Sequence, residues 1–393
     1  MRTDDHVRYI ALRELGDIRM GKQLSPAGRE APDQFPYLRV ANVFEGRIDF
    51  SDIKTMGFSP AERELFAVRP GDILLNEGQE NLRMVGRSAI YRGDPGAYCF
   101  QNTLIRFRPG RELLSEYAQA IFVHWRRSGV FARVAEKTSI SHLGGSRFGA
   151  LPFPYRSLPE QRRIVEVINA VAAQERSIEA SIAKQSAAQR STLEFLLDRF
   201  EWDSTLEDAS TGAIRNGFSP PESENWTGIY MLGLGCLTPS GFQPIQLKNC
   251  PRSVGPGHPA LLRDGDLLMS RANTRDLVGQ VGIYRDVGGP CIYPDLMMRI
   301  RPSKRCSADF LATVLTSHRV RRRIRDMAQG TSESMVKISR AGLMGIPLPL
   351  PSIEEQMHFL DLLGSFSLHL ENEVAELRKT RTLRLGLTDS LLS

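Results

Sequence analysis

The sequence lacks the features of a membrane or secreted protein. None of its apolar runs approaches the 18 residues of a membrane-spanning helix. The first residues, Met1 to His6, contain no apolar signal region. The five cysteines are an odd number, and no two have the CxxC spacing of a metal or redox site. We therefore expect reduced thiols in a cytoplasmic protein that does not enter a membrane.

The sequence also lacks the motifs of the common enzyme classes. It has no GxxxxGKS/T phosphate loop, no HExxH metal site and no GxSxG nucleophile turn. Its seven histidines are scattered without the spacing of metal ligands. We therefore predict no catalytic residue, no metal site and no cofactor. A fused methyltransferase is the enzymatic alternative, but no motif for a methyl donor supports it.

What the sequence does contain is a duplication with an offset of roughly 194 residues. Gly-Asp-Ile-Leu-Leu at 71–75 matches Gly-Asp-Leu-Leu-Met at 265–269. Val-Gly-Arg-Ser-Ala-Ile-Tyr at 85–91 matches Val-Gly-Gln-Val-Gly-Ile-Tyr at 278–284. Leu-Pro-Phe-Pro at 151–154, followed by Glu160 and Gln161, matches Ile-Pro-Leu-Pro at 346–349, followed by Glu355 and Gln356. A repeat this long is a whole domain, and two unlike copies suggest two unlike targets.

Each copy begins with a mixed region of short strands. Apolar runs such as 72–75 and 104–107, separated by glycine and proline turns, predict a twisted sheet. Helical stretches are expected from Glu112 to about Ala132 and from Ala308 to about Met327. The predicted fold class is α/β (α+β), with two homologous mixed domains separated by two long antiparallel helices in a pseudo-two-fold arrangement.

Each copy ends in a long predicted helix that starts at a capping box. Ser157 with Glu160, and Ser352 with Glu355, have the spacing of reciprocal caps. About 40 residues of helix span roughly 60 Å, too long for one face of a compact domain. Apolar residues at 3–4 spacing predict that the helices pair along a seam, although each stripe could instead pack on its own domain. The predicted seam consists of Ile164, Ile168, Val171, Ile178, Ile182, Phe359, Leu363, Phe366, Leu370 and Leu377.

Two polar segments in each copy are candidates for binding a polyanion, which the net charge of +6 also permits. The first follows the Gly-Asp strand and is rich in Asn, Gln and Arg, side chains that read purines in the major groove. The second precedes the Pro-x-Pro motif and offers hydroxyls and a lysine for phosphates. An ordinary polar loop is the alternative interpretation in both cases. The candidate DNA contacts are Asn76, Gln79, Asn81, Arg83, Lys137 and Ser139 in the first copy, and Ser270, Arg271, Asn273, Thr274, Arg275, Lys337 and Ser339 in the second.

With these motifs the chain resembles the specificity (S, HsdS) subunit of Type I restriction–modification systems. The most specific resemblance is the Leu-Pro…Glu-Gln entry into a long helix at 151–161, repeated at 346–356. The resemblance implies two target-recognition domains, 1–156 and 201–351, with spacer helices at 157–200 and 352–393. Each domain would read one half of a split, asymmetric site in double-stranded DNA.

The resemblance also implies partners that perform the chemistry. These are two copies of a DNA adenine methyltransferase subunit and a restriction translocase subunit. Because their catalysis is separate, the missing motifs in this chain agree with the family. The alternative function is a non-catalytic scaffold or regulator whose long helices bind a partner without reading DNA.

Overall fold

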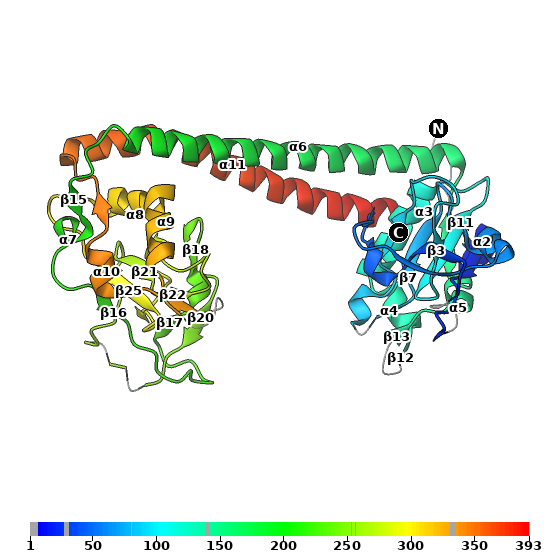
Figure 1. Cartoon of the computed structure of the whole chain (residues 1–393), viewed down its shortest axis with the longest axis horizontal. Helices are drawn as coiled ribbons and strands as arrows, with labels where there is room; N and C mark the ends of the chain where they lie inside the picture. The colour runs from blue at the N-terminus through cyan, green and yellow to red at the C-terminus, as the bar shows by residue number, and fades with distance from the viewer. Residues whose placement is uncertain are drawn as a thin grey trace. The chain divides into compact units, whose positions relative to one another are not determined.

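The computed structural model describes residues 7–26, 31–79, 81–137, 141–252, 254–255, 257–330 and 335–392. It divides into two compact units, which we call unit 1 (Met1–Glu179 with Glu376–Ser393) and unit 2 (Ala180–Ala375). Two 40-residue helices, α6 (Leu158–Leu197) and α11 (Ile353–Leu392), each contribute one part to unit 1 and the other part to unit 2 (Figure 1). The predicted division into two recognition domains and two spacer helices has other boundaries than these compact units, and it stays a prediction.

Unit 1 is built on a four-stranded sheet with the order β2-β11-β7-β9, in which every neighbouring pair is antiparallel. A three-stranded sheet, β10-β3-β6, lies beside it in the same globular part. The elements are β1 (Arg8–Ala11), β2 (Gly16–Met20), β3 (Gln34–Leu38), β4 (Val43–Phe44), β5 (Arg47–Ile48), β6 (Lys54–Gly57), α2 (Pro60–Phe66), β7 (Ile73–Asn76), β8 (Gly78–Gln79), β9 (Ser88–Ile90), β10 (Cys99–Phe100), β11 (Leu104–Pro109), α3 (Ser115–Arg127), α4 (Val130–Val134), β12 (Glu136–Lys137), β13 (Ser141–His142), α5 (Gly145–Gly149) and β14 (Pro152–Tyr155).

Unit 2 repeats the topology of these two sheets. Its four-stranded sheet has the order β16-β25-β21-β23, and its three-stranded sheet has the order β20-β17-β24. The elements are β15 (Ser204–Thr205), α7 (Leu206–Ala209), β16 (Arg215–Asn216), β17 (Tyr230–Leu232), β18 (Leu237–Thr238), β19 (Gly241–Phe242), β20 (Leu247–Asn249), β21 (Leu267–Ser270), β22 (Ala272–Asn273), β23 (Val281–Ile283), β24 (Cys291–Ile292), β25 (Met297–Ile300), α8 (Ala308–Thr316), α9 (His318–Met327), β26 (Val336–Lys337), α10 (Arg340–Met344) and β27 (Pro347–Leu348). The predicted mixed fold and its duplication are confirmed.

The helical stretch that the sequence predicts within each copy is in fact two helices. In unit 1 the break lies between α3 and α4, where Gly129 has a positive φ of 79°. In unit 2 the break lies at Ser317, whose hydroxyl accepts a hydrogen bond from the Val320 N–H and caps α9. The apolar period continues across both breaks, so periodicity alone did not reveal them.

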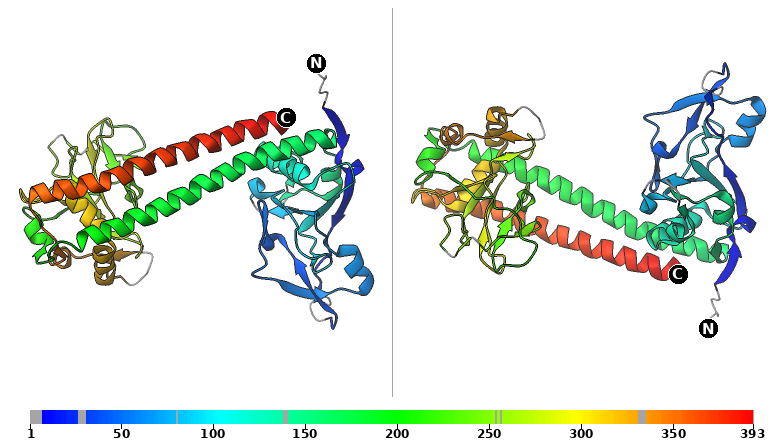
Figure 2. Two further views of the ribbon diagram at one scale, coloured as in Figure 1. Left: turned by 90° about the horizontal axis from the view of Figure 1, so that it is seen from above. Right: turned by 90° about the horizontal axis from the view of Figure 1, so that it is seen from below.

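The long helices form antiparallel pairs within each unit, as seen from two directions in Figure 2. In unit 1, Arg384 of α11 lies 3.0 Å from Glu175 of α6, and Arg381 lies 2.6 Å from Glu179. In unit 2, the Ser181 hydroxyl donates to Glu373, and the Gln189 amide donates to the Ser367 hydroxyl. The polar residues that interrupt the apolar seam of α6 are thus matched by polar residues of α11.

The predicted seam residues are buried or half-buried. Some pack on a globular core and others lie along the partner helix, so both alternatives from the sequence occur. Ile164 joins the core of unit 1 together with Leu392, whereas Phe359 and Leu363 join the core of unit 2. Leu377 is also buried, and Ile168, Val171, Ile178, Ile182, Phe366 and Leu370 are half-buried. Leu193 and Leu197 of α6 also join the core of unit 2. The start of α6 and the end of α11 therefore pack on the globular part of unit 1, and the end of α6 and the start of α11 pack on that of unit 2.

A buried glutamine fixes the start of each long helix to its own globular part. The Gln161 amide accepts a hydrogen bond from the Leu114 N–H at 2.8 Å and donates to the carbonyls of Glu112 and Arg156. The Gln356 amide likewise accepts from the Ser307 N–H at 2.9 Å and donates to the carbonyls of Arg305 and Pro351. Both side chains are fully buried. The Glu-Gln signature of the sequence is thus a clamp between α6 and the start of α3, and between α11 and the start of α8.

The capping boxes predicted beside these glutamines are confirmed. The Ser157 N–H donates to the Glu160 carboxylate at 2.9 Å, and the Ser352 N–H donates to Glu355 at the same distance. The hydrogen bonds from Ser352 also lower the pKa of Glu355. The cap therefore holds a charged carboxylate at the positive end of the α11 dipole.

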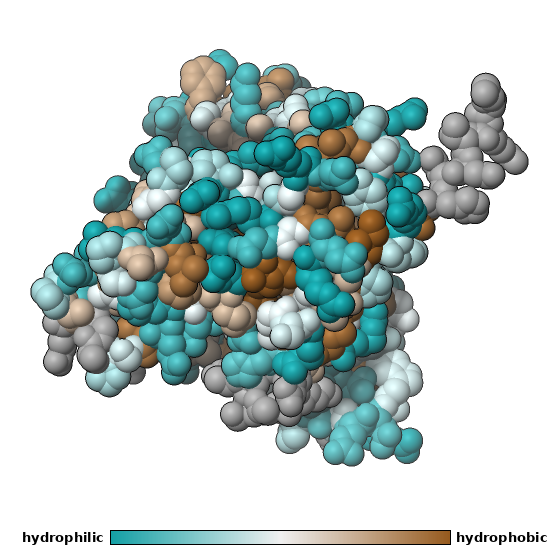
Figure 3. Space-filling view, turned by 90° about the vertical axis from the view of Figure 1, so that its right-hand side faces the viewer, coloured by the Kyte–Doolittle hydropathy of each residue, from teal (hydrophilic) through white to brown (hydrophobic). Residues whose placement is uncertain are grey.

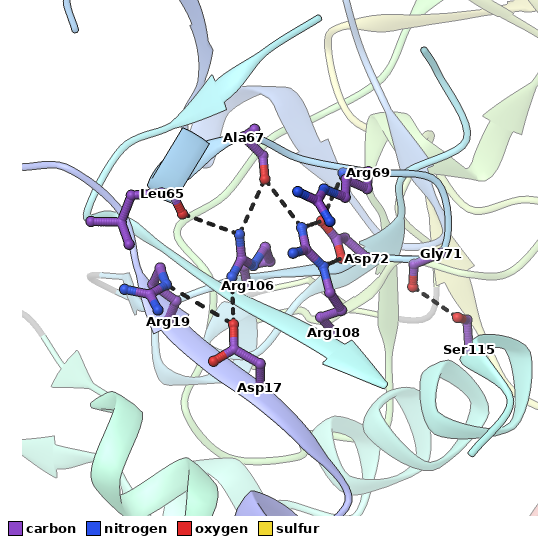
Figure 4. Close-up of polar contacts among 10 residues, drawn as sticks. All are labelled: Asp17, Arg19, Leu65, Ala67, Arg69, Gly71, Asp72, Arg106, Arg108 and Ser115. Atoms are coloured by element: carbon purple, nitrogen blue, oxygen red, sulfur yellow. Dashed lines mark hydrogen bonds and ion pairs between the residues drawn. The ribbon is translucent and has the colours of Figure 1, made fainter. Parts of the chain in front are cut away.

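The Gly-Asp signature is a second structural device. Gly71 turns the chain with a φ of 92°, and the buried Asp72 carboxylate accepts from the Arg69 N–H (Figure 4). Arg108 of β11 binds Asp72 at 2.6 and 2.8 Å, which raises the pKa of Arg108. Its neighbour Arg106, buried in the same sheet, donates to Asp17 and to two carbonyls. Unit 2 has a related device, in which the counterpart of Arg106, Arg299, binds Asp266 at 3.0 Å and Asp266 accepts from the Arg263 N–H. These arginines are neutralised within the sheet, so we assign them no contact with DNA.

The glutamine clamp predicts a local effect of substitution. Gln356→Ala leaves the buried Ser307 N–H without its acceptor, and an unpaired buried group costs about 1–3 kcal/mol. We therefore expect faster amide hydrogen exchange at Ser307 but not at Leu114, with the reverse in Gln161→Ala. Gln174→Ala, an exposed position on α6, is the matched control and should change neither amide. Equal exchange at both amides in every variant would show that the clamp does not hold the helix start.

Candidate nucleic-acid interface

The two candidate segments of each copy, distant in the sequence, meet in a small β-ladder. In unit 1, β8 pairs with β13, so that Gln79 lies opposite Ser141 and Gly78 opposite His142; β12 extends the same ladder. In unit 2, β22 pairs with β26, so that Ala272 lies opposite Lys337 and Asn273 opposite Val336. We call these two-segment structures the reading ladders. One sheet edge in each unit therefore carries both the amide-rich and the hydroxyl-rich segment.

The reading ladder of unit 1 is only partly described. Asn76 is fully buried, so as placed it cannot reach DNA, and Asn81 is exposed. Ser139 lies outside the described residues, as do the side chains of Gln79, Arg83 and Lys137. The Glu77 carboxylate lies at hydrogen-bond distance, 2.7 Å, from His142 Nδ1. Sequence reasoning did not single out His142, because the pairing of β8 with β13 is not visible in the sequence.

The reading ladder of unit 2 presents different side chains on the same backbone. Ser270 is fully buried, and its hydroxyl donates to the Ala272 carbonyl, so it too has no access to DNA. Arg271 and Asn273 are half-buried, and Thr274 and Lys337 are exposed. The Asn273 oxygen accepts from the Thr274 N–H at 2.8 Å, which leaves its amide nitrogen to donate. The ladder thus retains an arginine, an amide and a lysine at the surface.

Two of the predicted contacts instead have structural partners. Arg275 donates from Nη1 to the carbonyl oxygens of Arg325 and Ala328, at 3.1 and 3.4 Å, and so binds the C-terminal end of α9. The Ser339 hydroxyl accepts from the Gly342 N–H and caps α10. The physical reason is the same for both, since a helix end leaves backbone groups that nearby polar side chains satisfy. We therefore do not carry Arg275 forward as a base contact.

The arginine-rich face of α9 also divides into structural and exposed members. Arg321 is buried and donates to the carbonyls of Val278 and Asp276, and burial lowers its pKa to about 10. The Arg319 guanidinium lies 4.1 Å from the Trp202 ring centroid, in cation–π contact. Arg322 and Arg323 are exposed. Arg322 lies 3.9 Å from Asp326 in an exposed ion pair within the helix.

The charges at equivalent ladder positions differ between the units. Glu77 corresponds to Arg271, because each immediately precedes the first strand of its ladder. His142 corresponds to Lys337, because each lies opposite the first residue of that strand. An acid–imidazole pair thus stands where the other copy has two cations. Figure 3 shows one face of the molecule, on which hydrophilic side chains surround patches of hydrophobic ones.

The described residues contain no group of acidic, histidine or cysteine side chains placed to hold a metal ion. In the same part of the chain, no helix has the length and apolar composition needed to span a bilayer. All five cysteines are free and buried.

Comparison with known proteins confirms the family resemblance. No family model matches the chain. Over 92% of its length it is 21% identical to the Type I restriction enzyme EcoKI specificity subunit of Escherichia coli (strain K12), and 22% identical to the StySPI specificity subunit of Salmonella potsdam. In each case the match spans 81% of the relative.

Solved structures support the same fold. A chain from a structure of a type I R-M system, described by its complex assembly and conformational transition, aligns with a TM-score of 0.63 at 17% identity, covering 98% of this chain and 97% of that one. The S subunit of the type I system from M. genitalium aligns with a TM-score of 0.50 at 14% identity, covering 100% and 98%. These likenesses establish the architecture of the whole chain.

The role of Arg275 at the end of α9 predicts a loss of stability. Arg275→Ala removes a cation from the negative end of a helix dipole and two carbonyl contacts, so we expect unit 2 to lose about 1–2 kcal/mol. Arg322→Ala, on the exposed face of the same helix, should change stability by less than about 0.5 kcal/mol. Denaturant unfolding of the two variants beside the parent measures the difference. Equal stability of both variants would contradict the assigned contact.

Proposed function

We propose that this chain is the sequence-specificity subunit of a Type I restriction–modification complex. The observation that carries the proposal is one duplicated domain, each copy with a reading ladder of the same backbone and unlike side chains, in a chain similar over most of its length to two curated specificity subunits. Because the ladders differ in charge and hydrogen-bonding groups, the two copies read different half-sites. The recognised site is therefore split and asymmetric.

Within this proposal, residues 1–156 and 201–351 are the target-recognition domains, and 157–200 and 352–393 are the spacer helices. Arg271, Asn273 and Lys337 carry recognition in unit 2, with Thr274 beside them. Asn81 and the ladder segments around Gln79 and Lys137 carry it in unit 1. Amide and guanidinium groups read base edges, whereas lysine and hydroxyl groups hold phosphates.

The chemistry of the complex lies with partner subunits. We assign two copies of a DNA adenine methyltransferase subunit and a restriction translocase subunit to this role, and no catalytic step to this chain. The support is that the two curated relatives are named as specificity subunits of Type I restriction enzymes. Since its target is cellular DNA, we place the chain in the cytoplasm.

Methylation mapping tests the split-site proposal. Cells that express this chain with its cognate methyltransferase should show one bipartite motif with an unread gap. Replacing both Asn273 and Lys337 with alanine should alter only the half read by unit 2, and Lys304→Ala, an exposed lysine outside the ladder, should alter neither half. A contiguous or palindromic motif, or a change in both halves, would overturn the assignment.

The salt dependence of binding separates DNA reading from a scaffold role. Neutralising phosphates releases counterions, so the affinity of the complex for its duplex should fall linearly on a log–log plot against salt. Lys337→Ala should reduce the slope by about 0.9, the value for one lost phosphate contact. Binding that is independent of salt would favour a scaffold whose helices recruit a partner without contacting DNA.

A further inference from the structure

An arginine outside the predicted segments has an unusual environment in unit 1. The side chain of Arg87, just before β9, lies with its guanidinium 4.8 Å from the ring centroid of Phe44. Arg47 lies 4.7 Å from the same centroid. Phe44 and Arg47 belong to the β4–β5 hairpin, whose turn at Gly46 has a positive φ of 69°. The hairpin thus supplies an aromatic surface that orients the guanidinium of Arg87.

The hydrogen bond that Arg87 makes is to a neutral group. With the Asn76 amide turned so that its oxygen faces Arg87, that oxygen accepts from Nε at 3.2 Å and from Nη2 at 3.3 Å. Among the described residues, no carboxylate lies within ion-pair distance of Arg87; nearby Glu45 binds Arg126 at 3.0 Å. Arg106 and Arg108, by contrast, each bind an aspartate. Arg87 is therefore a half-buried cation, fixed by an amide and a ring, and its nearest acid, Glu45, is bound directly to Arg126 rather than to Arg87.

Arg87 lies at the same end of the sheet as the reading ladder. The Asn76 N–H donates to the Arg87 carbonyl at 2.8 Å, and Leu75 pairs with Ser88 in the β7–β9 register. Asn76 ends β7, and the chain then enters β8 of the ladder after a single residue. The buried Asn76, which has no access to DNA itself, thus connects the ladder to Arg87.

Unit 2 keeps this backbone and changes the side chains. The Ser270 N–H donates to the Gln280 carbonyl at 2.7 Å, as Asn76 does to Arg87, so Gln280 occupies the position of Arg87. In the register of the β18–β19 hairpin, Thr238 replaces Phe44 and Gly241 replaces Arg47. The side chains of this arginine–aromatic cluster therefore differ between the units, although the backbone is shared. Such a difference is expected of residues that contact bases at which the two half-sites differ.

We propose that Arg87 is a specificity-determining residue that reads a guanine in the half-site of unit 1. This inference rests on the proposed function. A fixed guanidinium that has no direct carboxylate partner makes a bidentate hydrogen bond to O6 and N7 of guanine in the major groove. Phe44 and Asn76 act as positioning residues that hold the guanidinium fork in one plane. Gln280 stands at the same point of unit 2 but is buried, so we assign it no base contact.

The test is methylation of a duplex library by the complete complex, with every base of the wild-type motif varied in turn. Arg87→Ala should reduce the preference for guanine over the other bases by roughly ten- to hundredfold at one position of one half-site. This is the discrimination that a single bidentate contact provides. Arg87→Gln should shift preference at that base toward adenine. Phe44→Ala should weaken discrimination at the same base only. Arg92→Ala, an exposed arginine paired with Glu116, is the matched control and should leave the motif unchanged.

Unchanged base preferences in the other half-site, which unit 2 reads, show that each variant complex is folded and assembled. An unchanged motif in Arg87→Ala would overturn the inference. Uniform weakening across all sequences, with a reduced salt slope, would make Arg87 a phosphate contact and would equally overturn it. Failure of the wild-type complex to select any sequence would instead refute the proposed function, so the two failures are distinguishable.

Discussion

The architecture depends on one buried side chain at the start of each long helix. A fully buried glutamine is tolerated only when its amide is satisfied, and Gln161 and Gln356 each bind three backbone groups. These groups come from the connector before the helix and from the turn before α3 or α8. A long helix has many directions available to it, and the clamp selects one at its first turn. The capping serine and glutamate fix where the helix begins, and the glutamine fixes where it points.

Sequence reasoning succeeded where the signals are local or repeated. The capping boxes, the two 40-residue helices and the duplicated sheet follow from spacing that can be counted. It could not show where a side chain is paired with a distant backbone carbonyl. Arg275, a candidate DNA contact in the sequence, donates to carbonyls at the end of α9 that the fold brings to it. Asn76 and Ser270 are polar residues at the end of a strand, and only the three-dimensional packing shows that they are buried. Arg87 could have been found by comparing the copies, because Gln280 replaces it inside an otherwise similar segment.

The two copies show how one scaffold can carry unlike surfaces. In both, an aspartate after the turn glycine accepts a backbone N–H and binds an arginine of the neighbouring strand. In both, a ladder joins the segment after that strand to the segment before the Pro-x-Pro motif. The hydrogen bonds that define this backbone use main-chain groups and a few buried residues. Exposed positions are therefore free to change in charge and shape without a cost in folding.

The sharing of each long helix between the units has a consequence for synthesis. Leu392 packs in the core of unit 1 beside residues from the first half of the sequence, such as Ile164. An emerging polypeptide thus completes its earlier globular part only after the closing helix has left the ribosome. Until then, the apolar stripe of the first helix lacks its partner and is exposed to chaperones or to other nascent chains. Unit 2 is formed by one continuous stretch of sequence, so all of its segments are synthesised before the last segment of unit 1.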